Sequence, residues 1–375
     1  MRPNNIFTIG LLGGGQLGRM MATAAKHMGY RIIVLDPTPD CPAAQVADMH
    51  IEAAYDDKGA IRKLESLSDV VTYEFENVDL DAAKLLEEKG KLPQGSLLLE
   101  ISRDRANEKN LMKELDLPVA PFAIVTDGKE LLTAVREIGF PAVVKTCRGG
   151  YDGKGQLKLE SKADLQEAAA FVGQNGRCIL ESWLTFDKEI SIVLTRGQDG
   201  EMTFFPVAEN EHRDHILYRT IAPADITEDV AEQARHAAGK LAEAAGVVGT
   251  FTVEMFVSGN DIYMNEVAPR PHNSGHYTIE ACTVSQFEQH VRAICALPLL
   301  PVHFIGAAVM INLLGEELEQ YWEQPDRPLA HIHDYGKQEA KAKRKMGHFT
   351  MVGTSRESLL DATDAFTRSL GGNKA

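Results

Sequence analysis

The sequence predicts an α/β and α+β protein of three domains, and three observations lead to this fold class. The chain has 375 residues, more than one ordinary hydrophobic core accommodates. It opens with an apolar strand, a glycine-rich turn and a helix, which is typical of a parallel βαβ unit. From residue 178 onward short strands follow one another, which indicates an antiparallel sheet. We expect domains at residues 1–102, 103–178 and 179–375.

The composition indicates a soluble protein of a reducing cytoplasm. Charged residues make up 25% of the chain and hydrophobic residues 44%, as in globular proteins. The net charge of -15 argues against non-specific binding to nucleic acid or to an anionic membrane, so any phosphate site must be local. The five cysteines are widely spaced and indicate neither a disulfide framework nor a zinc site. The apolar run 304–314 is too short to span a bilayer, and the run 6–12 lacks the cleavage site of a signal peptide.

The N-terminal βαβ pattern carries a glycine loop, residues 13–18, between the strand 6–12 and the helix 16–28. Such a loop on a helix N-terminus binds phosphate. The next strand, 31–36, ends at Asp36, where a dinucleotide-binding fold places its ribose acid. An NAD-dependent dehydrogenase is therefore one interpretation, although the same loop binds other phosphates equally well.

The strand 69–73 leads into the acidic segment Tyr73-Glu-Phe-Glu-Asn77. One of its two glutamates, Glu74 or Glu76, can face the crevice at the carboxyl edge of the sheet, but solvated loop acids are an equally good interpretation. A helix at 79–88 and a break at 93–95 follow, and we expect the first domain to end near Ser102.

The second domain is predicted to hold a glycine-rich flap. A helix at 104–115 places Arg105 and Lys109 on one face, and the short apolar strand 142–145 ends on Lys145. The loop that follows can wrap backbone N–H groups around an anion through Gly149, Gly150, Gly153 and Gly155. With Lys145 and Lys154 it predicts a flap over polyphosphate, whereas the alternative is a solvated hairpin. Its spacing is not that of a P-loop.

The third domain is predicted to carry a metal site on the hairpin formed by strands 249–256 and 262–266. With a three-residue loop at 259–261, Glu254 and Glu266 stand opposite each other, and a divalent cation removes their repulsion. With a two-residue loop they fall on different faces and are merely solvated. We favour the metal, because the neighbouring positions are apolar.

Two further segments have the character of binding elements. The loop 268–276 is polar and contains two prolines, and polar loops beside a site carry substrate contacts more often than packing. The segment 337–345, which includes Lys337 and Arg344, is basic in an acidic protein. It is either a solvated charge run or a site for a substrate phosphate.

The flap resembles the nucleotide lid of the ATP-grasp superfamily. A closer resemblance, to the 5-(carboxyamino)imidazole ribonucleotide synthases of purine biosynthesis, extends from near residue 9 to near residue 348. It rests on five motifs, Gly-Gly-Gly-Gln-Leu-Gly-Arg-Met (13–20), Tyr-Glu-Phe-Glu-Asn (73–77), Gly-Gly-Tyr-Asp-Gly-Lys-Gly-Gln (149–156), Asn-Glu-x-Ala-Pro-Arg-Pro-His-Asn-Ser-Gly-His (265–276) and Arg-Lys-Met-Gly-His (344–348). The resemblance implies an ATP-grasp fold with an N-terminal Rossmann-like (pre-ATP-grasp) domain, a small lid domain and a C-terminal antiparallel-sheet domain.

The same resemblance implies an activity. ATP would phosphorylate bicarbonate, and the carboxyphosphate, or CO₂ released from it, would carboxylate the exocyclic amine of 5-aminoimidazole ribonucleotide. Mg²⁺, or Mn²⁺ in its place, would bridge the phosphates. A cytoplasmic homodimer is the form that the family suggests.

Site residues implied by the resemblance fall into four groups. ATP would be held by Arg105, Lys145, Gly150, Tyr151, Asp152, Gly153, Lys154, Gly155, Gln156, Glu181, Ser182, Trp183, Leu184, Glu189, His212, Asn265 and Glu266. The metal would be bound by Glu254 and Glu266. Bicarbonate and the imidazole would be oriented by Tyr151, Asp152, Lys154, Asn273, Ser274 and His276. The ribonucleotide would be met by Gln16, Glu76, Lys337 and Arg344.

Three alternatives stay open at the level of sequence. Another ATP-grasp ligase, acting on a different amine such as glycinamide ribonucleotide, would share all the ATP residues. A dehydrogenase would need a nicotinamide pocket, for which the chain offers no feature beyond the glycine loop. A non-catalytic nucleotide-binding regulator is disfavoured, because both candidate metal acids and both flap lysines are present.

Overall fold

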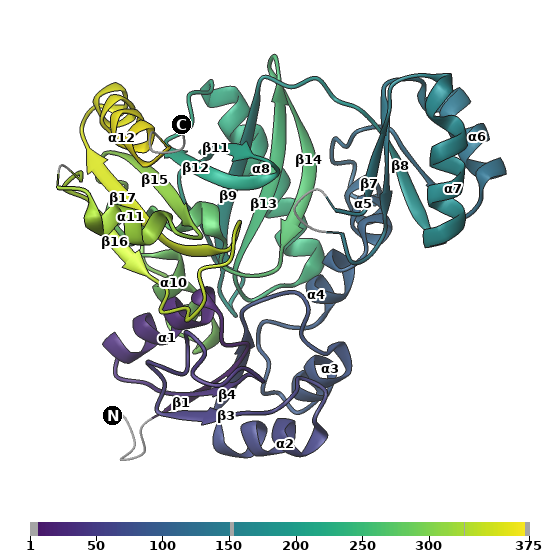
Figure 1. Cartoon of the computed structure of the whole chain (residues 1–375). Coiled ribbons are helices and arrows are strands. Elements are labelled where there is room, and N and C mark those ends of the chain that lie inside the picture. Colours follow the sequence, from purple (N-terminus) through teal and green to yellow (C-terminus); the bar gives the residue numbers. More distant parts are fainter. Residues whose placement is uncertain (1–6, 151–153, 326, 372–375) are drawn as a thin grey trace.

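The chain folds into three parts, each built around its own sheet (Figure 1). The computed structural model describes residues 7–150, 154–325 and 327–371. None of the helices in these ranges is both long and apolar enough to span a membrane.

The N-terminal part is a parallel four-stranded sheet in the order β3-β2-β1-β4, with helices on both faces. Leu12 and Tyr73, at the carboxyl ends of the neighbouring strands β1 and β4, are paired, so the glycine loop and the acidic segment start at the same edge. The strands are β1 (Thr8–Leu12), β2 (Arg31–Leu35), β3 (Met49–Ile51) and β4 (Val70–Tyr73). The helices are α1 (Gln16–His27), α2 (Lys58–Leu67), α3 (Leu80–Glu88) and α4 (Leu97–Ser102).

The middle part is an antiparallel sheet in the order β5-β8-β6-β7, and α6 and α7 cover one of its faces (Figure 1). Its strands are β5 (Phe122–Val125), β6 (Ala142–Thr146), β7 (Gln156–Leu159) and β8 (Cys178–Ser182). Its helices are α5 (Arg105–Glu114), α6 (Gly128–Ile138), a 3₁₀ turn (Lys162–Asp164) and α7 (Leu165–Asn175).

Strand β8 lies in this small sheet, whereas we expected residue 179 to open the large one. It pairs with β5 on one side and with β6 on the other, so its partners lie in the preceding 60 residues of chain. A division of the chain that follows the sheets therefore falls between β8 and β9, not at residue 178.

The C-terminal part is a nine-stranded sheet in the order β14-β13-β9-β11-β12-β15-β17-β16, with β10 paired to β9. Helix α8 packs on one face, against the apolar side chains of β9, β13 and β14. The strands are β9 (Lys188–Arg196), β10 (Met202–Phe204), β11 (Ala208–Arg213), β12 (Ile216–Ala222), β13 (Gly249–Ser258), β14 (Asp261–Ala268), β15 (Ala307–Leu314), β16 (His331–Asp334) and β17 (Lys345–Gly353). The helices are α8 (Glu228–Ala245), a 3₁₀ turn (Asn273–Gly275), α9 (Thr278–Ala281), α10 (Gln286–Ile294), α11 (Glu317–Glu323) and α12 (Arg356–Gly371).

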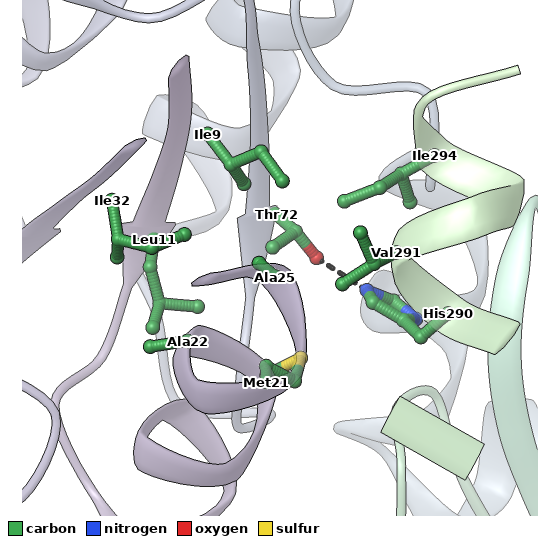
Figure 2. Close-up of a pocket in the computed structure, with 10 residues that line it drawn as sticks. All are labelled: Ile9, Leu11, Met21, Ala22, Ala25, Ile32, Thr72, His290, Val291 and Ile294. Carbon is green, nitrogen blue, oxygen red and sulfur yellow. Dashed lines mark hydrogen bonds between the residues drawn. The ribbon is translucent and has the colours of Figure 1, made fainter. Parts of the chain in front are cut away.

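A buried hydrogen-bond relay joins the N-terminal and C-terminal parts. Figure 2 shows His290 of α10 facing Thr72 of β4, beside an apolar cavity of about 10 Å³. The N–H of Thr250 donates to Nδ1 of His290 (3.0 Å), so Nε2 carries the proton and donates to Thr72 (2.8 Å). Thr72 donates to the side chain of Gln94 (2.5 Å), which donates to the carbonyl of Pro269 (2.8 Å). The polar loop 268–276 is thereby tied to the N-terminal sheet.

We predict a pH-dependent effect of His290→Gln on stability. Burial lowers the pKa of His290 from 6.5 to about 3, so the folded chain stays unprotonated there while the unfolded chain takes up a proton below pH 6.5. This stabilisation is complete above pH 6.5 and is lost as the pH falls toward 3. In urea unfolding, the variant should be about 1–3 kcal/mol less stable than the wild type at neutral pH. At about pH 5 the difference in unfolding free energy between wild type and variant should be smaller by about 2 kcal/mol.

His236→Gln, at an exposed position of α8, is the matched control and should show no such change with pH. A difference between wild type and His290→Gln that stays constant with pH would contradict a neutral His290 in the relay.

Candidate active site

A compact group of charges lies where α5 crosses the small sheet. The carboxylate of Glu181 on β8 lies 3.1 Å from Nζ of Lys145 and 3.7 Å from Nζ of Lys109. Burial disfavours ionisation of Glu181, but attraction by Lys109 and Lys145 outweighs burial and lowers its pKa. Burial also lowers the pKa of Lys109. Lys145 has the more exposed side chain, 19% against 4% for Lys109, and is the more accessible of the two cations.

The two ends of the glycine flap are held at the same place. Arg105, the first residue of α5, donates to the carbonyls of Gly150 (3.1 Å) and Thr146 (3.3 Å). The N–H of Thr146 donates to the carbonyl of Gly155 (2.9 Å). Gly155 has a φ of 71°, and a Cβ there would lie 2.7 Å from Oγ1 of Thr146, so this position requires glycine.

The predicted flap residues Tyr151, Asp152 and Gly153 lie outside the described residues. Lys154 is exposed, and Gln156 begins β7 directly opposite Lys145. The structure therefore brings both described ends of the predicted flap to the strand lysine.

The two candidate metal acids stand directly opposite each other. Glu254 on β13 pairs with Glu266 on β14. The three-residue loop on which we based this prediction is wrong, because Ser258 pairs with Asp261 and the turn is only Gly259-Asn260. A bulge shifts the register between Glu254 and Met255, adding Asn265 to β14, and this extra residue restores the pairing.

The electrostatics of this pair suit a cation. Burial and repulsion by Glu266 raise the pKa of Glu254 to about 7, so the pair is poorly stable with two negative charges. Imidazole Nε2 of His272 lies 3.5 Å from Glu254. The described ranges contain no cluster of three or more His, Cys, Asp or Glu side chains placed to hold a metal. Two carboxylates with the remaining positions left to phosphate and water are how Mg²⁺ binds beside nucleotides, so the residues present fit that ion.

A row of polar side chains crosses one face of the large sheet, opposite the apolar face covered by α8. Residues paired across neighbouring strands share a face, as do residues two apart in one strand, so the pairing fixes this row. The row contains Glu266, Glu254, Ser191, Glu189, Asn210, Thr220, Asn312 and His348. The metal acids are thus one end of a continuous polar surface.

Glu189 and His212 form an ion pair on this surface, with Nδ1 of His212 2.5 Å from the carboxylate. Burial opposes protonation of His212, but its hydrogen bond to Glu189 and the attraction of both Glu189 and Glu254 raise its pKa. Both residues, predicted to hold ATP, therefore lie beside the metal acids. His212 is presented by strand β11.

The polar loop packs its side chains onto the same row. Ser191 donates to the hydroxyl of Ser274 (2.8 Å), and the amides of Asn273 and Asn312 exchange two hydrogen bonds (3.0 and 2.6 Å). His276 is fully buried and packs against His348, with ring centroids 4.6 Å apart and the ring planes tilted by 33°. Burial lowers the pKa of His276 well below its ordinary value, so its imidazole is neutral. These three predicted catalytic residues face inward and hold the loop against the sheet.

The N-terminal glycine loop already binds carboxylates of the chain itself. The N–H groups of Gly15 and Gly18 donate to Glu74 (2.6 and 2.8 Å), and the N–H of Gly14 donates to Asp36 (2.7 Å). Asp36 also accepts from the Tyr55 hydroxyl (2.5 Å). Asp36 is therefore committed to structure, and the prediction of a ribose acid for a dinucleotide loses its basis.

The basic segment faces this loop. Lys337 donates to the carbonyl of Lys345 (2.6 Å), and Arg344 donates to that of Glu339 (3.1 Å). Burial, with repulsion by Arg344, lowers the pKa of Lys337 to about 8, while attraction by Glu74 opposes the shift. The carbonyl of Gly336 accepts from Gln45 (2.8 Å) in the N-terminal part, which holds the two parts together here.

The remaining predicted residues are placed as follows. Gln16 is the first residue of α1 and half-buried. Glu76 forms an ion pair with Arg270 (2.8 Å), whose attraction lowers the pKa of Glu76. Ser182, the last residue of β8, and Trp183 and Leu184 after it, connect the small sheet to the large one, and Lys158 lies 4.3 Å from the Trp183 ring centre.

Family models match nearly the whole chain. The ATP-grasp domain matches residues 110–287, the ribonucleotide synthetase preATP-grasp domain residues 6–102, and the phosphoribosylaminoimidazole carboxylase C-terminal domain residues 308–362. The N5-carboxyaminoimidazole ribonucleotide synthase of Bacillus subtilis is 48% identical over 346 residues, 92% of this chain and 91% of that protein.

The chain belongs to the N5-carboxyaminoimidazole ribonucleotide synthase family, ATP-dependent ligases of the ATP-grasp superfamily.

Solved structures of the family superimpose closely. The Staphylococcus aureus synthetase in complex with ADP has a TM-score of 0.90 and 43% identity, covering 96% of this chain and 97% of that one. The Aspergillus clavatus synthase in complex with ADP and 5-aminoimidazole ribonucleotide has a TM-score of 0.88 and 30% identity, covering 96% of this chain and 99% of that one. The predicted fold class and family are thereby confirmed.

The sequence analysis missed Glu108 and gave Lys109 no role in the site, yet both are buried in this synthase-family chain. A signal was present, because both lie on the helical stripe that includes Arg105 and Met112. Charged residues on an apolar stripe indicate buried partners, which the chain supplies from β8 and β14.

We predict that Glu181→Gln strongly destabilises the fold. Removing this charge leaves Lys109 buried without its counter-ion, which costs about 3–5 kcal/mol. Lys145→Met is the comparison and should cost less, because Lys109 and Glu181 still pair and Lys145 is more exposed. Chemical unfolding of both variants measures this. Equal losses in the two variants would contradict the assignment of Glu181 as the shared counter-ion.

Proposed function

We propose that this protein carboxylates 5-aminoimidazole ribonucleotide to N5-carboxyaminoimidazole ribonucleotide in purine biosynthesis, consuming ATP and bicarbonate and releasing ADP and phosphate. The observation that carries the proposal is the pairing of Glu254 with Glu266 on the polar face of the large sheet, beside the Glu189–His212 pair. Relatives with 5-aminoimidazole ribonucleotide and ADP bound support the choice of substrates.

In the first step an oxygen of bicarbonate attacks the γ-phosphorus of ATP, and the bond to the β,γ-bridging oxygen breaks to give carboxyphosphate and ADP. Lys145 and Lys154, with the flap N–H groups, hold the phosphates, and Arg105 fixes the flap at its base. Glu254 and Glu266 would hold Mg²⁺ or Mn²⁺, and that ion would supply positive charge to neutralise the phosphates. No protein nucleophile is required, because positioning and charge neutralisation suffice for phosphoryl transfer.

In the second step the exocyclic amine forms a bond to the carboxyl carbon and gives up a proton to the phosphate that leaves. The carbon–oxygen bond to phosphate breaks either in the same event or earlier, with CO₂ released. Asn273, Ser274 and His276 hold the loop that lines this reaction, and Tyr151, Asp152 and Lys154 orient bicarbonate and the imidazole.

The ribonucleotide phosphate binds at the basic segment in this proposal. Because Glu74 accepts from Gly15 and Gly18, the glycine loop donors are not open to a second anion, and Lys337 and Arg344 supply the positive charge instead. Gln16 and Glu76 complete the ribonucleotide site.

Two rivals are disfavoured by particular observations. A ligase acting on another amine, such as glycinamide ribonucleotide, is disfavoured by the match of residues 308–362 to the phosphoribosylaminoimidazole carboxylase C-terminal domain. A dehydrogenase is disfavoured by the hydrogen bonds that Asp36 makes within the chain.

We further propose that the enzyme works in the cytoplasm as a homodimer. The half-exposed Trp322 and the exposed Ile305 and Leu329 support the dimer, because they offer apolar surface to a partner copy.

Phosphate release measured with ATP, bicarbonate and 5-aminoimidazole ribonucleotide, each omitted in turn, tests the function. We expect full turnover only with all three. Turnover unaffected by replacing the aminoimidazole with glycinamide ribonucleotide would favour the rival ligase.

In the same assay Glu266→Gln should abolish bicarbonate-stimulated ATP turnover, because it removes one of the two metal carboxylates. Its unfolding transition should stay near that of the wild type, since removing one of two repelling charges does not destabilise the strands. Normal turnover by this variant would show that the metal assignment is wrong.

The lowered pKa of Lys337 predicts that the use of the ribonucleotide depends on pH. With its pKa lowered to about 8, Lys337 is cationic below that pH and neutral above it, so kcat/KM for 5-aminoimidazole ribonucleotide should fall as the pH rises through about 8. Lys337→Arg keeps its charge and should move the fall to higher pH. Lys341→Arg, at an exposed position, serves as the control with an unchanged profile. Identical profiles for wild type and Lys337→Arg would refute this role.

A further inference from the structure

Strand β14, which carries Glu266, is the edge strand of the large sheet, and on its outer side the described residues provide only an isolated bridge between Val119 and Met264. The first half of α5 and the segment after it cover that side. Lys109 donates to the carbonyl of Met264 (2.8 Å), and the N–H of Met264 donates to the carbonyl of Pro118 (2.7 Å). Glu108 accepts from the N–H of Val267 (2.6 Å).

These contacts fit only the bulged form of β14. In a regular strand the backbone groups of every second residue point to the same side, so those facing away from β13 would be Met264 and Glu266. The extra residue Asn265 moves this outward position from Glu266 to Val267. Glu108 therefore binds an N–H that points outward because of the bulge.

The bulge is also what puts Glu266 opposite Glu254. Without it the two-residue turn would pair Glu254 with Asn265, and the side chain of Glu266 would point to the other face of the sheet. We propose that Glu108 and Lys109 are positioning residues of the metal site, which grip β14 on either side of its bulge and so fix the carboxylate of Glu266 against Glu254.

Their burial supports this role. Both residues are only 3% exposed, and two adjacent ionisable residues on a helix are rarely buried without a task. The negative charge of Glu181 and the backbone carbonyl of Met264 compensate Lys109. Burial and repulsion by Glu266 raise the pKa of Glu108 to about 8, which the adjacent Lys109 and the N–H of Val267 offset only in part. The inference rests on the proposed function, because it presupposes that Glu254 and Glu266 bind a divalent cation.

The test is the affinity of the full-length protein for Mn²⁺ in the presence of ADP, measured from the electron paramagnetic resonance of free Mn²⁺. Glu108→Ala should weaken binding by about 10- to 100-fold, the usual effect of removing a group that orients a metal ligand. Glu108→Gln keeps an oxygen that accepts from Val267 and should restore most of the affinity. Glu114→Gln, at an exposed position of the same helix, is the matched control and should bind like the wild type.

Backbone hydrogen exchange gives a second measurement, independent of metal. The segment 262–268 should exchange faster in Glu108→Ala and at nearly the wild-type rate in Glu108→Gln. Lys109→Met removes the hydrogen bond to the carbonyl of Met264, on the other side of the bulge, and should weaken Mn²⁺ binding as well. The inference therefore stays testable if Glu108→Ala does not fold.

Glu266→Gln separates this inference from the proposed function. If Glu266→Gln loses Mn²⁺ while Glu108→Ala and Lys109→Met bind it normally, the metal site stands and the positioning role is wrong. Equal losses in Glu108→Ala and Glu108→Gln would also overturn it, because the charge and not the hydrogen bond would then matter. If Glu266→Gln binds Mn²⁺ like the wild type, the proposed metal site itself fails.

Discussion

Two carboxylates held face to face across one hairpin are the constraint on which the rest of the structure depends. Like charges at paired positions of neighbouring strands repel, and in the partly desolvated setting of Glu254 and Glu266 this repulsion raises the pKa of Glu254. A fold keeps such a pair only where a ligand or a proton compensates it. The other face of the sheet is apolar and packs on α8, and this burial offsets the repulsion between the two carboxylates.

Around that pair, buried charge is matched locally. Glu181 compensates two lysines, Arg270 compensates Glu76, and backbone N–H groups compensate Glu74. The buried imidazole of His276 has no such charge to compensate, because burial lowers its pKa and keeps it neutral. Lys145 and Lys337, which we propose bind the phosphates of the substrates, are only half-buried, in a protein of net charge -15.

The sequence predicted the family, the fold class and the meeting of Glu254 with Glu266, although the loop length assumed for that hairpin was wrong. It could not predict the bulge at Asn265, because the contacts that accompany it come from α5, about 150 residues earlier in the chain. Strand β8 was assigned to the wrong sheet for a related reason, since its apolar run does not show which strands will pair with it. The glycine loop was expected to bind phosphate, whereas Glu74, 59 residues beyond Gly15, occupies its donors. Tyr151, Asp152 and Gly153 lie outside the described residues, so their part in the site stays a prediction.

The position of β14 at the sheet edge has a consequence for how the chain is made. An uncovered edge strand can add to a strand of another molecule and start aggregation. Glu108 and Lys109 precede β14 in the sequence, so during synthesis the cover leaves the ribosome before the strand that it protects. The newly made edge therefore meets a partner within its own chain as soon as it forms, and the residues that shield it are those that shape the acidic pair.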